Sequence, residues 1–359
     1  MAITPVHIIL VFFCAPLVSS PAVAEINFYM SSDGADANAG TSVQKPIASL
    51  TRAKQLVGDA LAHERGEKIF VHIAGGTYVA QSIIWDLDAG TSIVQFVGPK
   101  SGKQAIFDGK GASGNFFTVT APSSAERFNA NVKLSNVVIS DYCEGVSFGD
   151  YRSKAPIYGS ELNRVEFTRI GSKYDASVGR KRGNCVAAVR VQWAPGTILK
   201  NLKFSNIENL PQNQTELKKY GPLALHAIYI ADRSSNIHIE NSSFRSFTGS
   251  PIRIRNRSDH IKIVGVSFSD PLQVKNKPNS PAYNFAAVSQ WNCTTGNQAC
   301  LSKPDECPSV GISIEQLSPG DGMLPYLDET PTRGMPTCKD TALLKRYKLR
   351  GAEFSVLTK

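Results

Sequence analysis

The sequence predicts an all-β chain that folds as a single-stranded, right-handed parallel β-helix, a solenoid of stacked coils. The first observation is a phrase repeated at a fixed offset, since three pairs of apolar residues are each 24 positions apart: Ile228 and Ile252, Ile237 and Ile261, and Phe244 and Phe268. A constant period in this range is typical of solenoids, in which each repeat buries its apolar face only against its neighbours. The second observation is an alternation of apolar residues with a period of two inside each phrase, which indicates strands rather than helices.

The phrase recurs more loosely upstream, where residues 187–191 and 198–204 match its two halves. We therefore expect two short strands per coil, joined by polar corners. Four phenylalanines mark one position of successive coils at separations of 37, 40 and 24 residues: Phe167, Phe204, Phe244 and Phe268. Because the strand phrases on either side stay intact, the additional residues are expected to loop out at 171–183 and 207–223. Such insertions gather on one face of a solenoid, often the binding face.

Residues 1–24 are read as a secretory signal peptide. They contain no Asp, Glu, Lys or Arg, and Ala22, Val23 and Ala24 fit a small-x-small cleavage site. The protein is therefore expected to be secreted or periplasmic. No later segment is apolar over the length that a bilayer requires, so no membrane partner is expected.

The cysteines predict disulfides. Six follow the expected signal peptide: Cys143, Cys185, Cys293, Cys300, Cys307 and Cys338. An even number in an exported chain favours disulfide bonds, and no spacing typical of a zinc site is present. The last four lie in a segment without the coil phrase and are expected to pair among themselves, while Cys143 would pair with Cys185.

The segment after the signal peptide carries the phrase FYMSSDGADANAGTS at residues 28–42, followed by KPIASL at 45–50. It predicts a strand, a polar turn and a short helix near residues 50–60. The phrase resembles the N-terminal cap of secreted right-handed β-helix proteins of the pectate-lyase-like superfamily. Such a helix covers the unpaired edge at the open end of the solenoid. The cap occurs in lyases, epimerases and hydrolases alike, so it indicates the architecture and not the reaction.

These features divide the chain into four parts. We expect the signal peptide at 1–24, the N-terminal cap at 25–62, the coils at 63–270 and, at 271–359, a disulfide-braced C-terminal segment that closes the helix. A solenoid of this length forms one elongated unit, and a monomer is expected.

The composition indicates an anionic partner. The chain has a formal net charge of +9 and a pI of about 9.1. Export and the lack of a nucleic-acid-binding motif argue against nucleic acid as the partner, which leaves an acidic polysaccharide as the better candidate. The alternative is a general surface charge that serves solubility.

The strand alternation places a set of cationic and aromatic side chains on one outward face. Arg190, Tyr229 and Arg253 are expected to stack in one column, about 4.8 Å apart. One step further along the strands lies a second column that includes Arg255, and Arg257 follows at the corner. Arginines in successive coils can hold consecutive carboxylates of an extended polysaccharide through bidentate pairs, so Arg190, Arg255 and Arg257 are predicted to bind substrate.

His226 opens the strand that contains Tyr229. The motif HAIYI at 226–230, followed one coil later by IRIR at 252–255, resembles the His and Arg coils of alginate and glycosaminoglycan lyases and of mannuronan epimerases. The resemblance implies that His226 and Tyr229 exchange protons with the substrate, while Arg253 neutralises its carboxylate and stabilises the developing negative charge. The alternative for His226 is a corner histidine bonded to a neighbouring carbonyl.

Other chemistries find less support in the sequence. Calcium-dependent elimination needs carboxylates on adjacent coils, yet Asp232 aligns with Trp193 and Asn256, so no cofactor is expected. The acids at 141, 144 and 150 are expected to be solvated and far from the column, which also weakens hydrolysis by two carboxylates. Trp193 or Trp291 could stack against a sugar ring. The leading function is therefore β-elimination or C5 epimerisation of a uronate-containing polysaccharide, with a glycoside hydrolase or a non-catalytic carbohydrate-binding protein as alternatives.

Overall fold

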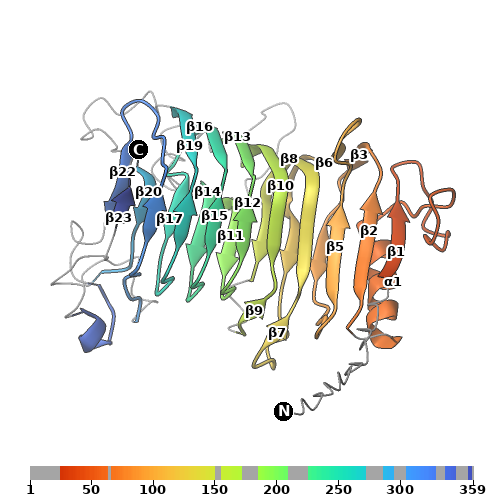
Figure 1. Cartoon of the computed structure of the whole chain (residues 1–359), viewed down its shortest axis with the longest axis horizontal. Coiled ribbons are helices and arrows are strands. Elements are labelled where there is room, and N and C mark those ends of the chain that lie inside the picture. Colours follow the sequence, from red (N-terminus) through yellow and green to blue (C-terminus); the bar gives the residue numbers. More distant parts are fainter. Residues whose placement is uncertain are drawn as a thin grey trace, which may run out of the picture.

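The computed structural model describes residues 25–63, 66–149, 155–171, 185–208, 225–271, 286–294, 305–328, 336–344 and 355–357. The expected signal peptide and nearly all of the two expected insertions lie outside these residues. In the described part the chain winds into a right-handed parallel β-helix, as the sequence predicts. The strands stand side by side along the long axis, and helix α1 (Leu50–His63) lies at the end beside β1 (Figure 1).

Three walls of parallel strands surround the core. The first wall is formed by these strands and by parts of two longer strands, β8 and β10: β1 (Glu25–Met30), β2 (Lys68–Ile73), β5 (Ile93–Val97), β12 (Ile198–Lys200), β15 (His238–Glu240), β18 (Lys262–Val264), β21 (Ser313–Glu315) and β23 (Ser355–Leu357). The second wall consists of β3 (Gly76–Val79), β13 (Lys203–Ile207), β16 (Ser243–Phe247), β19 (Ser267–Pro271) and parts of β6, β8 and β10.

The third wall carries the candidate site. It consists of β4 (Ile83–Trp85), β11 (Ala187–Gln192), β14 (His226–Ala231), β17 (Ile252–Ile254), β20 (Ala286–Gln290), β22 (Leu324–Asp328) and the ends of β6 and β8. The three long strands that turn corners are β6 (Ala105–Val119), β8 (Val132–Phe148) and β10 (Glu161–Ile170). A separate pair, β7 (Phe128–Asn129) and β9 (Ile157–Tyr158), lies beside the coils.

The 24-residue repeat predicted from the sequence corresponds to the register of adjacent strands in the structure. Ile228 pairs with Ile252 in the third wall, and Phe244 pairs with Phe268 in the second. The expectation of two strands per coil is wrong, because the second half of the phrase splits into β15 and β16. The corner between them is Asn241, which adopts a left-handed backbone conformation (φ 48°) that asparagine tolerates well.

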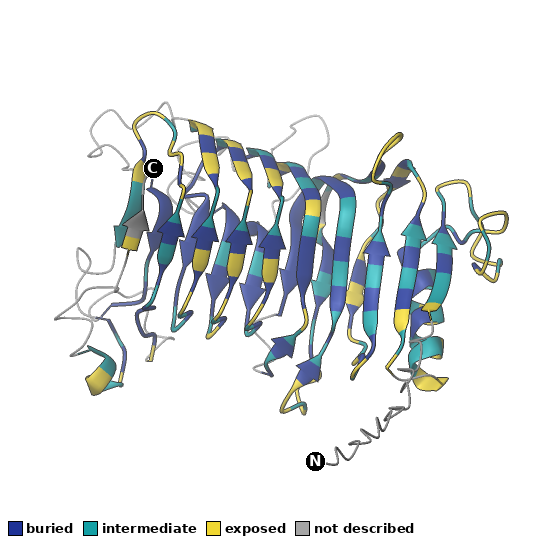
Figure 2. Ribbon diagram, in the orientation of Figure 1, coloured by how far each residue is buried: buried dark blue, intermediate teal, exposed yellow. Residues whose placement is uncertain are grey.

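The core is a continuous apolar column inside the walls. Figure 2 shows buried residues in strands along the whole length of the helix. The four phenylalanines that mark the repeat stack face to face, with ring centroids 5.1, 4.8 and 4.7 Å apart: Phe167, Phe204, Phe244 and Phe268. The unequal spacing of these residues in the sequence therefore leaves the register of the stack unchanged.

The cap has the predicted strand, turn and helix. Strand β1 pairs with β2, and α1 buries Leu50 and Val57 against the first coil. The Asp36 carboxylate in the polar turn accepts hydrogen bonds from the backbone N–H groups of Ala48 and Ser49, and the Ser49 hydroxyl accepts one from the N–H of Arg52. Ser49 thereby caps the helix, since the first N–H groups of a helix have no partner within it.

Disulfides brace the coils in the manner expected. Cys143 is bonded to Cys185, and Cys307 to Cys338. Cys293 is also disulfide-bonded, whereas Cys300 lies outside the described residues. The phrase ends near residue 270, but β20, β21, β22 and β23 continue two of the walls beyond it.

No helix in the described part of the chain is long and apolar enough to cross a membrane.

Candidate functional site

The predicted column lies on the third wall. Arg190 pairs in register with Tyr229, and Tyr229 with Arg253, between inward residues that are fully buried. The column is not a solvent-exposed surface, however, because Arg253 is only 8% and Arg255 only 9% exposed. Substitution of these outward arginines is therefore expected to affect stability as well as binding, since buried charges depend on their partners.

His226 lies at the start of β14, two positions before the inward-facing Ile228. It is 5% exposed, and its Nδ1 lies 2.7 Å from the carbonyl oxygen of Ser250 on the next coil. A carbonyl oxygen only accepts hydrogen bonds, so in the neutral ring Nδ1 carries the hydrogen and Nε2 keeps a lone pair. The bond to a neighbouring carbonyl, given above as the structural alternative, thus also fixes which nitrogen can act as a base.

The electrostatics keep His226 neutral. Burial, and then the positive charge of Arg253, lower its pKa to about 3. The ring stacks on Tyr229 with centroids 5.8 Å apart and planes 20° from parallel. Burial raises the pKa of the Tyr229 phenol, although the Arg255 guanidinium opposes part of this rise. At neutral pH the pair therefore consists of an uncharged imidazole and a protonated phenol.

Arg190 has a partner that the sequence does not reveal. Its guanidinium forms an ion pair with Glu144, which lies in β8 and is 2% exposed. The expectation that Glu144 is a solvated acid far from the column is wrong. The other carboxylate oxygen of Glu144 accepts a hydrogen bond of 2.9 Å from the N–H of Val186. The predicted pairing of Cys143 with Cys185 was a signal for this contact, because it brings the residues that follow both cysteines together.

Arg255 is the centre of a buried network. Its guanidinium donates two hydrogen bonds of 2.8 Å to the carboxylate of Glu306 and one of 3.0 Å to the hydroxyl of Tyr229. Trp291 covers the guanidinium at 4.0 Å. Glu306 also accepts a hydrogen bond from the N–H of Cys293. Arg255 therefore joins the third wall to the disulfide-braced C-terminal segment and orients the Tyr229 phenol.

The two remaining predicted residues lie at the far end of β11 and β17. Arg257 is partly exposed and lies 3.5 Å from Asp340. Trp193 is partly exposed, and the guanidinium of Arg233 lies 5.5 Å from its ring centre. The structure therefore brings His226, Tyr229 and Arg253 together, and it places Arg257 and Trp193 at the opposite edge of the same wall.

A polar ladder that the sequence analysis did not recognise runs along this opposite edge. Asp232 accepts hydrogen bonds from Gln192 at 2.9 Å and from Asn256 at 2.8 Å, each one coil away. The signal was the alignment of Asp232 with Asn256, which was used only to weigh calcium binding. Both oxygens of this carboxylate are thus already bonded to neighbouring amides.

A metal site finds no geometric support among the described residues. One group of potential ligand atoms lies close together there, formed by Asp305, Cys307 and Cys338. These two cysteines form a disulfide with each other, and disulfide sulfurs are not the thiolates that bind metals.

No protein-family model matches this chain, and no curated protein matches its sequence. Among solved structures, the chain is similar to the pectate lyase Pel9A, with 9% identity and a TM-score of 0.47 over 82% of this chain. This chain covers 63% of the length of Pel9A. A rhamnogalacturonan lyase has 12% identity and a TM-score of 0.26, with 84% of each chain covered.

Proposed function

We propose that this protein is a secreted enzyme that acts on a uronate-containing polysaccharide by β-elimination or C5 epimerisation. The observation that carries the proposal is the pairing of a neutral His226, with its Nε2 lone pair available, and a protonated Tyr229 beside the cation of Arg253. This arrangement provides a base, an acid and a positive charge within two adjacent coils.

Both reactions begin with the same step. A base removes the hydrogen on the carbon next to the carboxylate, and the electron pair that remains spreads into the carboxylate. Arg253 stabilises this developing charge, because a fixed cation in a poorly solvated site interacts strongly with it. We assign the base to Nε2 of His226. In elimination the electron pair then expels the glycosidic oxygen, and Tyr229 donates the proton that this oxygen needs. In epimerisation Tyr229 returns a proton to the opposite face of the same carbon.

The low pKa of His226 sets a condition on this mechanism. A base works best with a pKa near the operating pH, and the pKa of His226 without substrate lies well below neutral pH. A substrate carboxylate next to Arg253 would offset the guanidinium charge, which is the second cause of the low pKa after burial. Substrate binding therefore raises the basicity of His226 at the moment when it is needed.

The other predicted residues take supporting roles. Arg190 and Arg257 are proposed to contact the flanking sugars, and Trp193 to stack against one of them. Arg255 is proposed to contribute mainly as a positioning residue, because its hydrogen bonds to Glu306 and Tyr229 hold the phenol in place. The bonded states of Glu144 and Asp232 give a hydrolase mechanism with two free carboxylates less support.

The experiment that tests the proposal is a screen of acidic polysaccharides with purified protein. Elimination leaves a carbon–carbon double bond conjugated to the carboxylate, so the products absorb ultraviolet light. Epimerisation changes the uronate composition without new chain ends, which NMR spectroscopy detects. Reducing ends without absorbance would replace the proposal by hydrolysis, and binding without any product would leave a carbohydrate-binding protein. Disulfides support the proposed export, and a monomer is expected in solution.

A further inference from the structure

A second candidate site lies at the corner between the first and second walls, away from His226 and the third wall. It is a cavity of about 550 Å³ that we call the corner groove. One side is the loop that follows β5, from Pro99 to Gln104, and the floor consists of residues from four successive coils. These floor residues are Asn136, Val137, Val138, Arg164, Val165, Glu166, Asn201, Leu202, Lys203, Asn241 and Ser243.

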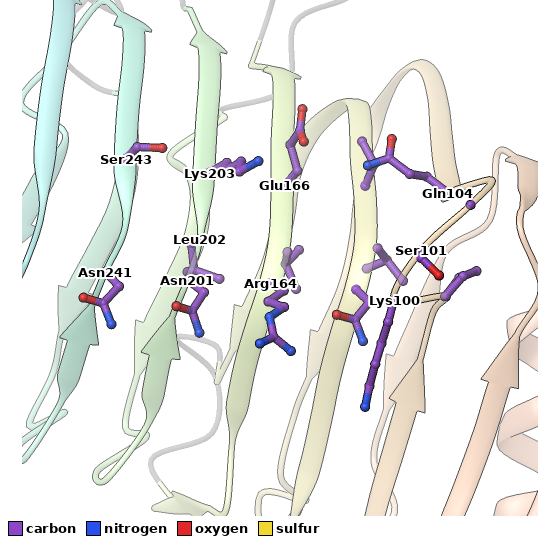
Figure 3. Close-up of a pocket in the computed structure, with 16 residues that line it drawn as sticks. Lys100, Ser101, Gln104, Arg164, Glu166, Asn201, Leu202, Lys203, Asn241 and Ser243 are labelled. Atoms are coloured by element: carbon purple, nitrogen blue, oxygen red, sulfur yellow. The ribbon is translucent and has the colours of Figure 1, made fainter.

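The floor is arranged in rows that cross the strands (Figure 3). Asn241, Asn201 and Arg164 lie in one row, and Ser243, Lys203 and Glu166 lie in a second row beside it. Adjacent coils are about 4.8 Å apart, so each row extends roughly 14 Å along the helix axis over its four coils. Amides and a hydroxyl at this spacing match the hydroxyl groups of an extended sugar chain, which also repeats along its length.

The groove carries excess positive charge. Lys100, Arg164 and Lys203 line it, and all three are exposed. Glu166 is the one carboxylate among the lining residues, which leaves a surplus of two positive charges. Within the described part of the chain, none of the three cations forms an ion pair.

Arg164 occupies a position that does not suit it. At this corner the residue on each coil has a left-handed backbone, and asparagine fills it on three coils, at 136, 201 and 241. Arg164 takes the same conformation with φ 54°, which is less favourable for arginine than for asparagine. Strain of this kind persists where the surrounding structure imposes it, and it is enriched at ligand-binding sites.

Three other arginines in the described part of the chain also have a left-handed backbone conformation. Arg169 is bonded to Asp141 at 2.6 Å, Arg257 lies 3.5 Å from Asp340, and Arg233 covers Trp193. Each of these has a partner in the protein. Among the described residues Arg164 has neither a carboxylate nor an aromatic partner, and it lies in the floor row of the corner groove.

From this placement we infer that the corner groove binds an anionic polysaccharide chain along the axis of the β-helix, as a non-catalytic site separate from the third wall. Lys100, Arg164 and Lys203 would contact carboxylate or sulfate groups, and the amide row would contact hydroxyls. Such a site holds a long polymer on the enzyme while other parts of it reach the third wall, which increases the effective concentration of substrate there. The binding itself does not depend on the proposed catalysis.

The test compares two variants with the same loss of charge. The groove variant combines Lys100→Gln, Arg164→Gln and Lys203→Gln. The control combines Lys45→Gln, Arg52→Gln and Lys68→Gln, which removes two lysines and one arginine from the cap and the first residue of β2. Calorimetry with polygalacturonate, dextran sulfate and neutral dextran measures the Kd for carboxylated, sulfated and uncharged chains. We expect the Kd for one or both anionic chains to rise about tenfold in the groove variant and less than twofold in the control, because three charged contacts are lost only in the former.

Several outcomes would overturn the inference. An equal loss in both variants would indicate an effect of net charge, and no loss would leave the groove without this role. Binding of duplex DNA, but of neither polysaccharide, that is lost only in the groove variant would assign the groove to nucleic acid. Turnover of short uronate oligomers should be unchanged in the groove variant. If no substrate is turned over at all, the proposed function fails while the binding result still decides the groove.

Discussion

Two sets of cationic side chains run along this molecule, one on the third wall and one in the corner groove. On the third wall Arg190 is half-buried and paired with Glu144, and Arg255 is buried and paired with Glu306. In the corner groove Lys100, Arg164 and Lys203 are exposed and have no ion-pair partner among the described residues. A buried arginine that already has a carboxylate partner serves structure first, because its charge is compensated within the protein. An exposed and unpaired one is free to meet an external anion.

The sequence analysis placed the predicted catalytic and substrate-binding residues on a single surface. The structure contains two cationic surfaces, which differ in burial and in ion pairing. The third wall offers a neutral imidazole, a phenol and the cation of Arg253 in one compact group, which suits proton transfer. The corner groove offers charge and amides spread over several coils, which suits binding of a chain. Each of the following predictions tests one side of this comparison.

The largest expected effect is on catalysis at the third wall. His226→Ala should lower turnover of an acidic polysaccharide by about two to four orders of magnitude, the usual contribution of one general base. Substrate binding should survive, because the corner groove and Arg253 are unchanged. The measurement is the initial rate of product formation against wild type at saturating substrate. An unchanged rate would move the reaction away from this coil.

The second prediction concerns the buried network of Arg255. Arg255→Ala leaves Glu306 buried without its cation, so we expect a loss of about 3–5 kcal/mol in the free energy of unfolding. Urea denaturation followed by fluorescence measures it. The double variant Arg255→Met with Glu306→Gln is the control, since it removes both charges and should recover a large part of the loss. A fully stable Arg255→Ala variant would instead favour the role in substrate binding expected from the sequence.

The arginines of the third wall show which features of the candidate site could be predicted from the sequence and which could not. The coil register follows from local patterns, so the alignment of Arg190, Tyr229 and Arg253 could be predicted. The partners could not, because Glu306 lies 51 residues from Arg255 and Glu144 lies 46 residues from Arg190. The length of each insertion must be known before such distant residues can be placed on a coil.

The strand count and the corner groove were not predicted from the sequence. The split of each second strand was missed although the sequence marks it, because the buried positions shift by one residue at Asn241, from Ile239 to Ser242 and Phe244. The row of the corner groove leaves a signal in the sequence, because Arg164, Asn201 and Asn241 each lie three residues before a phenylalanine that marks the coil. The groove was missed because its other side, the loop from Pro99 to Gln104, follows β5 and carries no coil phrase.

The third prediction uses the low pKa of His226. Its pKa is about 3 in the folded protein and near 6.5 when unfolded, so the unfolded chain binds more protons between these values. The stability that this difference contributes is present above pH 6.5 and falls as the pH decreases toward 3. At pH 5.5 the loss relative to pH 7.5 should be about 1.4 kcal/mol from this residue. Denaturation of wild type and His226→Asn at both pH values isolates the effect, since other groups titrate alike in both. An identical pH dependence in the two proteins would show that His226 is not buried and neutral.

The smallest expected effect lies in the corner groove and separates strain from function. Arg164→Asn replaces an arginine in a left-handed conformation by the residue that the neighbouring coils use at this corner. We expect the free energy of unfolding to rise by roughly 1 kcal/mol, because asparagine tolerates this backbone better. The affinity for polygalacturonate should fall at the same time, since one of the three groove cations is gone. The reverse change on the next coil, Asn201→Arg, is the control and should lower stability by at least as much, because it also removes the hydrogen bond from Asn201 to Asn163. A gain in stability without any loss of affinity would mean that the backbone strain at Arg164 does not serve binding. The affinity of the corner groove would then depend on Lys100 and Lys203 alone.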